Sequence, residues 1–207
     1  MSRITIKEFV EEKIDCYIFG DLQTLASLPE KSCGSCTDPM MLTILSAMEL
    51  IGGLMCDCSK PCQKQKAFNH FWSHLCELND NYDKIDNLKE IFYQCIRHGI
   101  AHYNLPKAGV SIARNGSQHL HLTDEQNLNV NVIILYRDIK KVYTKIKPSI
   151  LKNDKSERNL NNLIKNLERS NSNLTKAVRS KIPFSSTAAG THASLMMNLE
   201  ISSIDKN

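Results

Sequence analysis

Arg97 and His102 stand five positions apart in the segment Arg97-His98-Gly99-Ile100-Ala101-His102. A neutral imidazole can accept the proton of a ribose 2′-hydroxyl, and a guanidinium can hold two phosphate oxygens while charge develops at phosphorus. His98 adds a second imidazole that could act as an acid, a base or a phosphate donor. These residue types suit metal-free cleavage of RNA, with His102 as general base, Arg97 as transition-state stabiliser and His98 in support. We expect no cofactor and no bound metal at this site.

A helix over residues 86–103 must position these side chains. Its apolar residues recur three and four positions apart, which predicts one buried stripe: Leu88, Ile91, Phe92, Cys95, Ile96, Gly99, Ile100 and Tyr103. Five residues on an α-helix correspond to a rotation of about 140° and a rise of about 7.5 Å, so Arg97 and His102 should flank the opposite face. They could cooperate through the reach of the arginine, through a bend at Gly99, or through a second chain across a twofold axis.

The same six residues resemble the Arg-polar-x-x-x-His signature of HEPN domains, a superfamily of helical bundles. The looser similarity in helix order covers residues 40–147. The resemblance implies a bundle of four to six helices, usually a homodimer with paired motifs at its interface, and in many members a metal-independent endoribonuclease that serves as a toxin or defence effector. By position, Arg97 matches the family arginine, His98 the polar residue and His102 the catalytic histidine. Asn104 stands where one toxin branch has a regulatory tyrosine, which argues against that regulation here.

Cysteine clusters offer a competing metal chemistry. Cys33 and Cys36 have ligand-type spacing, as do the cysteines at positions 56, 58 and 62. The two clusters lie at opposite ends of one predicted helix about 27 Å long, so they should not share a zinc ion. Cys95, His98 and His102 could ligate a transition metal from one helix edge, a reading that competes with catalysis for the same histidine.

Other histidine pairs are weaker candidates. His70 and His74 stand four apart with no obvious third ligand, and a surface or core-edge position suits them better. His119 and His121 would alternate on a strand and face one side, where they could contact RNA or only solvent. The chain contains no Gly-rich phosphate loop and no nucleophile elbow, so ATP-dependent chemistry has no support.

Charge is distributed unevenly along the chain. Residues 137–181 carry 13 Lys or Arg against 4 Asp or Glu, whereas the net charge of all 207 residues is +4. A basic half on an acidic body fits a surface that meets phosphates, although solvated lysine-rich helices give the same pattern. The lysines most suitable for contacting RNA are Lys140, Lys141, Lys145 and Lys147.

Composition and periodicity favour a mainly α protein with one helical domain over residues 1–182 and a flexible tail over 183–207. Gly and Pro are scarce, at 8 and 6 residues, and 42% of the chain is hydrophobic. Alternation around the Asn115-Gly116 turn predicts a small β-hairpin at about 108–123, with a further short strand near 128–132. We expect helices at about 5–28, 38–55, 59–78, 83–103, 133–152 and 155–180, the last two separated near Pro148 or Asn153.

These patterns predict a cytoplasmic homodimer that binds RNA and does not enter a membrane. The apolar stretch from Met40 to Cys56 is interrupted by polar residues and suits a buried helix better than a bilayer span. An antitoxin or another operon partner is compatible with the resemblance. The alternative to a ribonuclease is a non-catalytic RNA- or protein-binding module that keeps the dimer.

Overall fold

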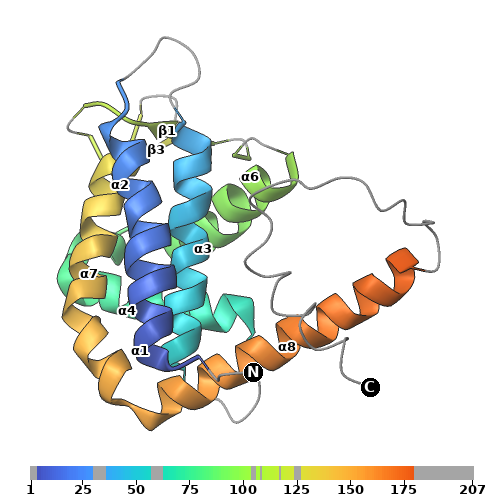
Figure 1. Ribbon diagram of the computed structural model, residues 1–207. Helices are drawn as coiled ribbons and strands as arrows, with labels where there is room; N and C mark the ends of the chain where they lie inside the picture. Colours follow the sequence, from blue (N-terminus) through green and yellow to red (C-terminus); the bar gives the residue numbers. More distant parts are fainter. Residues whose placement is uncertain are drawn as a thin grey trace, which may run out of the picture. The chain divides into compact units, whose positions relative to one another are not determined.

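A computed structural model describes residues 4–29, 36–56, 63–103, 106–107, 109–116, 118–123 and 127–179 of the 207-residue chain. It is mainly helical with a small three-stranded sheet, which confirms the predicted fold class (Figure 1). Contacts divide the chain into two units. One is Thr5–Leu163, which holds the bundle and the sheet, and the other joins Met1–Ile4 with Ile164–Asn207. The predicted tail at 183–207 lies outside the described residues.

The first helical rod runs from Ile6 to Ser27, close to the predicted range of 5–28. It comprises α1 (Ile6–Phe9), the π-helical η1 (Val10–Phe19) and α2 (Gly20–Ser27). Thr5 begins it with a capping box: its hydroxyl accepts from the Glu8 backbone N–H, and the Glu8 carboxylate accepts from the Thr5 N–H. The inward positions Val10, Ile14 and Leu22 are fully buried.

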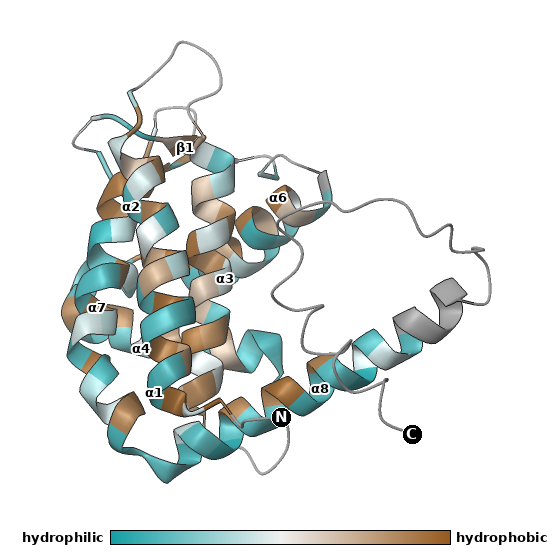
Figure 2. Cartoon of the chain, viewed as in Figure 1, coloured by the Kyte–Doolittle hydropathy of each residue, from teal (hydrophilic) through white to brown (hydrophobic). Residues whose placement is uncertain are grey.

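The central helix, α3 (Thr37–Met55), is the most apolar element of the bundle. It packs against α2, α4 and α7, and its ribbon is brown or pale over most of its length in Figure 2. By length and composition α3 could cross a membrane, but half of its most apolar window is buried inside the protein. The helix begins one residue before the expected range of 38–55. Its N-cap position falls on Cys36, whose backbone is left-handed.

Gly52 lets α3 and α4 (Lys64–Leu78) approach unusually closely. A Cβ atom at Gly52 would overlap the carbonyl oxygen of Ala67 and lie 2.9 Å from its carbonyl carbon and 3.2 Å from the backbone nitrogen of Phe71. A Cβ at the neighbouring Gly53 would meet the Ala67 Cβ at an ordinary 3.7 Å. Of the two glycines, Gly52 is therefore the one that the helix contact requires.

The rod that carries the candidate site runs from Leu88 to Tyr103, starting later than the predicted Asp83 or Asp86. It comprises α5 (Leu88–Glu90), the π-helical η3 (Ile91–Arg97) and α6 (His98–Tyr103). The segment before it contains the short 3-10 helix η2 (Asp80–Tyr82) and ends at Asn87, which has a left-handed backbone. The predicted apolar stripe is buried at Leu88, Phe92, Ile96 and Ile100.

The sheet has the strand order β1-β3-β2, so the predicted hairpin over 108–123 was wrong. β1 (Val110–Ala113) pairs in parallel with β3 (Leu128–Asn131), and β2 (His121–Leu122) pairs antiparallel with the same strand. Leu128 and Val130 are buried at 3% and 0% exposure, whereas both residues of β2 are exposed. The free energy gained by burying the apolar strand β3 at the centre of the sheet is larger than the local preference of Asn115-Gly116 for a hairpin turn.

The two basic helices are α7 (Val132–Lys152) and α8 (Asp154–Arg179), and they separate at Asn153, one of the two positions predicted. Pro148 lies inside α7 and does not end it. The start of α8 belongs to the bundle unit, where the Asn159 side-chain amide donates to the carbonyl oxygens of Leu54 and Cys56. From Ile164 onward α8 belongs to the second unit.

The contact at Gly52 predicts a large difference between two neighbouring substitutions. Gly52→Ala should lower the free energy of unfolding by about 3 kcal/mol, because the new methyl group meets backbone atoms that cannot move aside. Gly53→Ala should leave stability unchanged or raise it by up to about 1 kcal/mol, since alanine is the better helix former. Urea unfolding followed by circular dichroism measures both. Equal stability of the two variants would contradict the close approach of α3 and α4.

Candidate active site

The three residues with the strongest sequence case lie on consecutive turns of one helical rod. Arg97 is the last residue of η3, and His98 and His102 lie on α6. His102 is exposed, whereas Arg97 and His98 are half-buried. The exposed residues Gln94 and Ala101 lie on the same rod. The expected exposed face, opposite the apolar stripe, is therefore present.

Arg97 forms an ion pair that sequence analysis missed. Its Nε donates to Oε1 of Glu49 at 2.7 Å, and its Nη2 donates to Oε2 at 3.2 Å. The two side chains are only 16% and 11% exposed, so the pair is shielded from much of the solvent screening that weakens surface pairs. An arginine has five N–H donors, and Glu49 takes two. The other three N–H donors of Arg97 have no hydrogen-bond partner among the described residues.

The two histidines of the motif face one another. The rings of His98 and His102 are stacked, with centroids 5.7 Å apart and planes inclined by 25°. The His98 ring also makes a T-shaped contact with the Tyr93 ring, with centroids 5.1 Å apart and planes inclined by 72°. The backbone N–H of His98 donates to the Tyr93 carbonyl oxygen, which closes a five-residue turn and brings these two rings together. The local geometry therefore pairs His98 with His102 more directly than it pairs Arg97 with His102.

The surroundings of His98 favour its neutral form. Burial is the main cause that holds the pKa of His98 below its usual value, and the charges of Arg97, His102 and Lys107 lower it further. Lys107 is brought near because its backbone N–H donates to the carbonyl oxygen of Cys95 at 3.0 Å, where the chain returns after α6. At neutral pH His98 is therefore mainly an uncharged ring that supports the exposed His102.

The four lysines predicted to contact RNA all lie on α7, and each meets a partner on the bundle. Lys147 binds Asp15 at 2.5 Å, and Lys145 lies 3.9 Å from Glu77. Lys141 and Lys145 keep about two-thirds of their side chains exposed, so these surface pairs leave them able to contact other groups. Lys140 donates to Gln23 and Tyr136, and Lys141 pairs with Asp138.

These lysines do not gather around the motif. Figure 1 shows α7 and α6 on opposite sides of α3, with the α7 lysines bonded to residues of η1, α2, α4 and α7 itself. The four α7 lysines and the Arg97–His102 segment therefore belong to different faces of the bundle unit. Any ligand of the motif must be held mainly by the motif itself and its immediate neighbours.

His119 lies in a polar network, and the prediction that it shares an exposed strand face with His121 was wrong. The positive φ of 55° at Leu120 breaks the alternation that would place the two histidines on one side. The backbone N–H of Asn131 donates to His119 Nδ1 at 3.1 Å, so the ring proton must lie on Nε2. That nitrogen faces the Tyr82 hydroxyl at 2.9 Å, and the hydroxyl donates to Asp138 Oδ2 at 3.0 Å.

Burial shifts both titrating members of this network toward their uncharged forms. It lowers the pKa of His119 to about 4, although the nearby Asp138 carboxylate acts in the opposite direction. Burial together with Asp138 raises the pKa of Tyr82 far above its usual value. His121, in contrast, is exposed on β2. The network joins η2, the sheet and α7 as a structural element of the bundle.

The part of the chain that the structure describes contains no candidate metal site. No group of three or more His, Cys, Asp or Glu residues there is placed to hold an ion. The predicted set of Cys95, His98 and His102 is therefore not arranged as a metal site. His70 and His74 contact each other edge to face at 5.5 Å, and His74 Nδ1 lies 3.2 Å from Glu77. Three of the cysteines proposed as ligands, Cys33, Cys58 and Cys62, lie outside the described residues.

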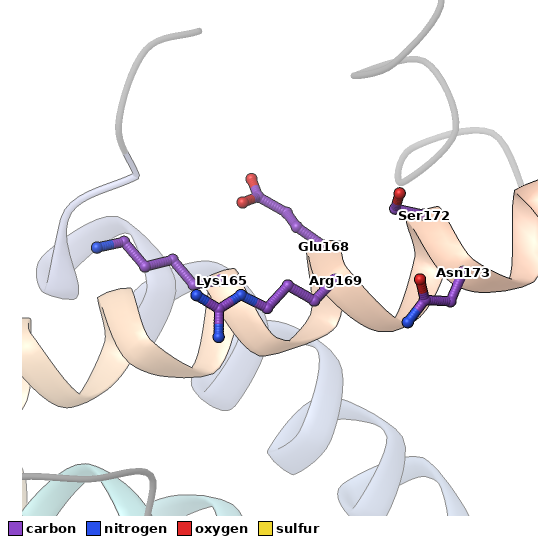
Figure 3. A pocket seen from close by; sticks show the side chains of 5 residues that line it. All are labelled: Lys165, Glu168, Arg169, Ser172 and Asn173. Carbon is purple, nitrogen blue, oxygen red and sulfur yellow. The ribbon is translucent and has the colours of Figure 1, made fainter.

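A surface hollow of about 430 Å³ lies along α8 (Figure 3). Its described wall comes from a single helix and carries both signs of charge on exposed side chains. Those residues are Lys165, Glu168, Arg169, Ser172 and Asn173. A wall of solvated side chains from one helix does not fix a ligand from several directions, so we assign no chemistry to this hollow.

Comparison of the chain with protein-family models, with curated proteins and with solved structures found no match.

The Arg97–Glu49 pair predicts strong coupling between the two side chains. Arg97→Met or Glu49→Leu alone should each lower the free energy of unfolding by about 3 kcal/mol, because each leaves a shielded charge without its partner. The double variant should lose clearly less than the sum, since it removes both charges. Urea unfolding of the four proteins gives the coupling energy. Simple additivity of the two single losses would contradict the pair.

The His119 network predicts a loss of stability in mild acid. The folded-state pKa of about 4 lies below the ordinary value of 6.5, so the unfolded chain binds the proton first. Stability from this group is complete above about pH 6.5 and falls by up to about 3 kcal/mol as the pH drops to about 4. His119→Asn should show a flatter pH profile of unfolding free energy than the wild type. His121→Asn, an exposed control, should keep the wild-type slope, and identical slopes for all three proteins would contradict the network.

Proposed function

We propose that this protein is a metal-independent endoribonuclease of the HEPN type. The observation that carries the proposal is the stacked His98–His102 pair beside Arg97, whose guanidinium is fixed by Glu49 with three N–H donors left over. Phosphodiester transfer without a metal needs a base and an oriented cation. The exposed His102 can be the base, the neutral His98 supports it, and Arg97 is the cation.

The proposed reaction is an attack by the neighbouring ribose hydroxyl. His102 accepts the proton of the 2′-hydroxyl, and the 2′-oxygen then forms a bond to phosphorus. The 5′-oxygen leaves and takes a proton from solvent, because the lowered pKa of His98 makes that ring a poor acid at neutral pH. The free N–H groups of Arg97 bind the non-bridging oxygens, where negative charge develops. His98 orients the His102 ring through stacking.

Homodimer formation is part of the proposal. Ala101, a small residue, is exposed on the same helical rod as Arg97 and His102. Two such rods related by a twofold axis would bring the arginine of one copy toward the histidine of the other. RNA as substrate, an antitoxin or operon partner and a cytoplasmic location remain predictions from the sequence.

A non-catalytic RNA- or protein-binding module is the second candidate. The observation in its favour is that Glu49 engages Arg97 in an ion pair of the kind that also serves purely structural roles. This alternative predicts that RNA is retarded in gels but not cut. It also predicts that reversing charges within residues 137–181 abolishes the retardation.

Cleavage assays in EDTA test the ribonuclease. The purified chain should cut single-stranded RNA, and His102→Ala should lower the rate at least about 100-fold, because general base catalysis is lost. His121→Ala replaces an exposed histidine on β2 and serves as the matched control, with an unchanged rate. RNA that stays intact with the wild-type protein, or is cut equally well by His102→Ala, would rule out this mechanism.

A further inference from the structure

A second pocket, of about 470 Å³, opens between the end of α2, the loop after β1 and the start of α7. None of its lining residues belongs to the proposed ribonuclease site. Aliphatic residues of α2 and of the first turn of α7 form its apolar wall. Its polar wall consists of Arg114, Asn115, Gly116, Asn131 and Arg137.

Arg114 is fixed in the wall of this pocket. The residue is only 6% exposed, and its Nη2 lies within hydrogen-bond distance of three backbone carbonyl oxygens. These belong to Leu25, Ala26 and Leu28, at 2.6, 2.9 and 2.7 Å. The guanidinium therefore caps the carboxyl end of α2, and its position does not depend on a ligand.

Arg137 supplies the second cation, from the second turn of α7. Its side chain is exposed, and no hydrogen bond or ion pair joins it to another residue in the described ranges. A long cationic side chain on the rim of a pocket can fold over a bound anion without breaking an existing bond.

The charges around the pocket sum to a clearly positive value. The two arginines contribute two positive charges, and no Asp or Glu is among the described lining residues. The carboxyl end of α2 and the amino end of α7 carry about half a charge each, of opposite sign, so they nearly cancel. The Asn131 side chain already accepts from the backbone N–H groups of Ile133 and Ile134, so the arginines and not the helix end provide the attraction.

We propose that this pocket binds the phosphate monoester of a small molecule. A phosphate monoester carries between one and a half and two negative charges at pH 7, which matches two guanidinium groups. The volume lies in the range of small-ligand sites, and the aliphatic wall can cover the uncharged part of the ligand. A nucleic-acid backbone offers only one charge for each phosphate, so it matches the paired arginines less well.

Isothermal titration calorimetry tests the proposal with defined probes. Inorganic phosphate and adenosine 5′-monophosphate should each bind the full-length protein at one site per chain, whereas adenosine should not. Arg137→Gln should weaken phosphate binding at least tenfold. Arg158→Gln removes an equally exposed arginine from the start of α8 and should change the affinity less than twofold. Circular dichroism should show wild-type folding for both variants.

Three outcomes would overturn the proposal. One is the absence of saturable binding by both phosphate probes. Another is equal weakening by Arg137→Gln and Arg158→Gln, which would indicate attraction by overall charge. The third is that a single-stranded DNA oligonucleotide without terminal phosphates binds through Arg137 while the monoesters do not. None of these results depends on RNA cleavage, so the pocket and the ribonuclease can fail separately.

Discussion

The close approach of α3 and α4 at Gly52 is the constraint on which the arrangement of the bundle depends. With no side chain at this position, the backbone of one helix rests on the backbone of the other near Ala67 and Phe71. Glu49 lies three residues earlier on α3 and therefore on a neighbouring part of the helix surface. The helix that packs on α4 through Gly52 thus also carries the carboxylate that meets Arg97. Core packing and the candidate site share one helix.

The helices could be predicted from the sequence because apolar spacing within one segment decides them. The sheet could not. Asn115-Gly116 is a strong turn signal, but it acts over a few residues, whereas the burial of Leu128 and Val130 depends on the whole bundle. The same limit applies to the site. The i, i+4 spacing of His98 and His102 is visible in the sequence, whereas the bond from Arg97 to Glu49 spans 48 residues. In the sequence Glu49 is one polar residue within an apolar helix, and nothing near it indicates that Arg97 is its partner.

Polar groups inside the bundle serve to position its elements. The Asn131 side-chain amide donates to the Gly116 carbonyl oxygen while its oxygen caps α7, and its backbone N–H holds His119. Tyr82 then extends the same chain of bonds to Asp138. Sequence patterns assign His119 to an exposed strand because alternation was the only available guide. Its actual environment is set by the left-handed turn at Leu120 and by a tyrosine 37 residues away.

The π-helical turns of η3 have a consequence for how this chain can vary. A π-helix contains about one more residue in each turn than the α-helix on either side of it. A deletion of one residue within Ile91–Arg97 could therefore be absorbed by conversion to ordinary α-helix, with the backbone ladder intact. Because the wider turn holds the extra residue, the residues after the deletion would keep nearly the same orientation about the helix axis. Arg97 would stay beside Glu49 and the stacked imidazoles would face the same side, so a natural length change of one residue in this segment would preserve both the fold and the chemistry.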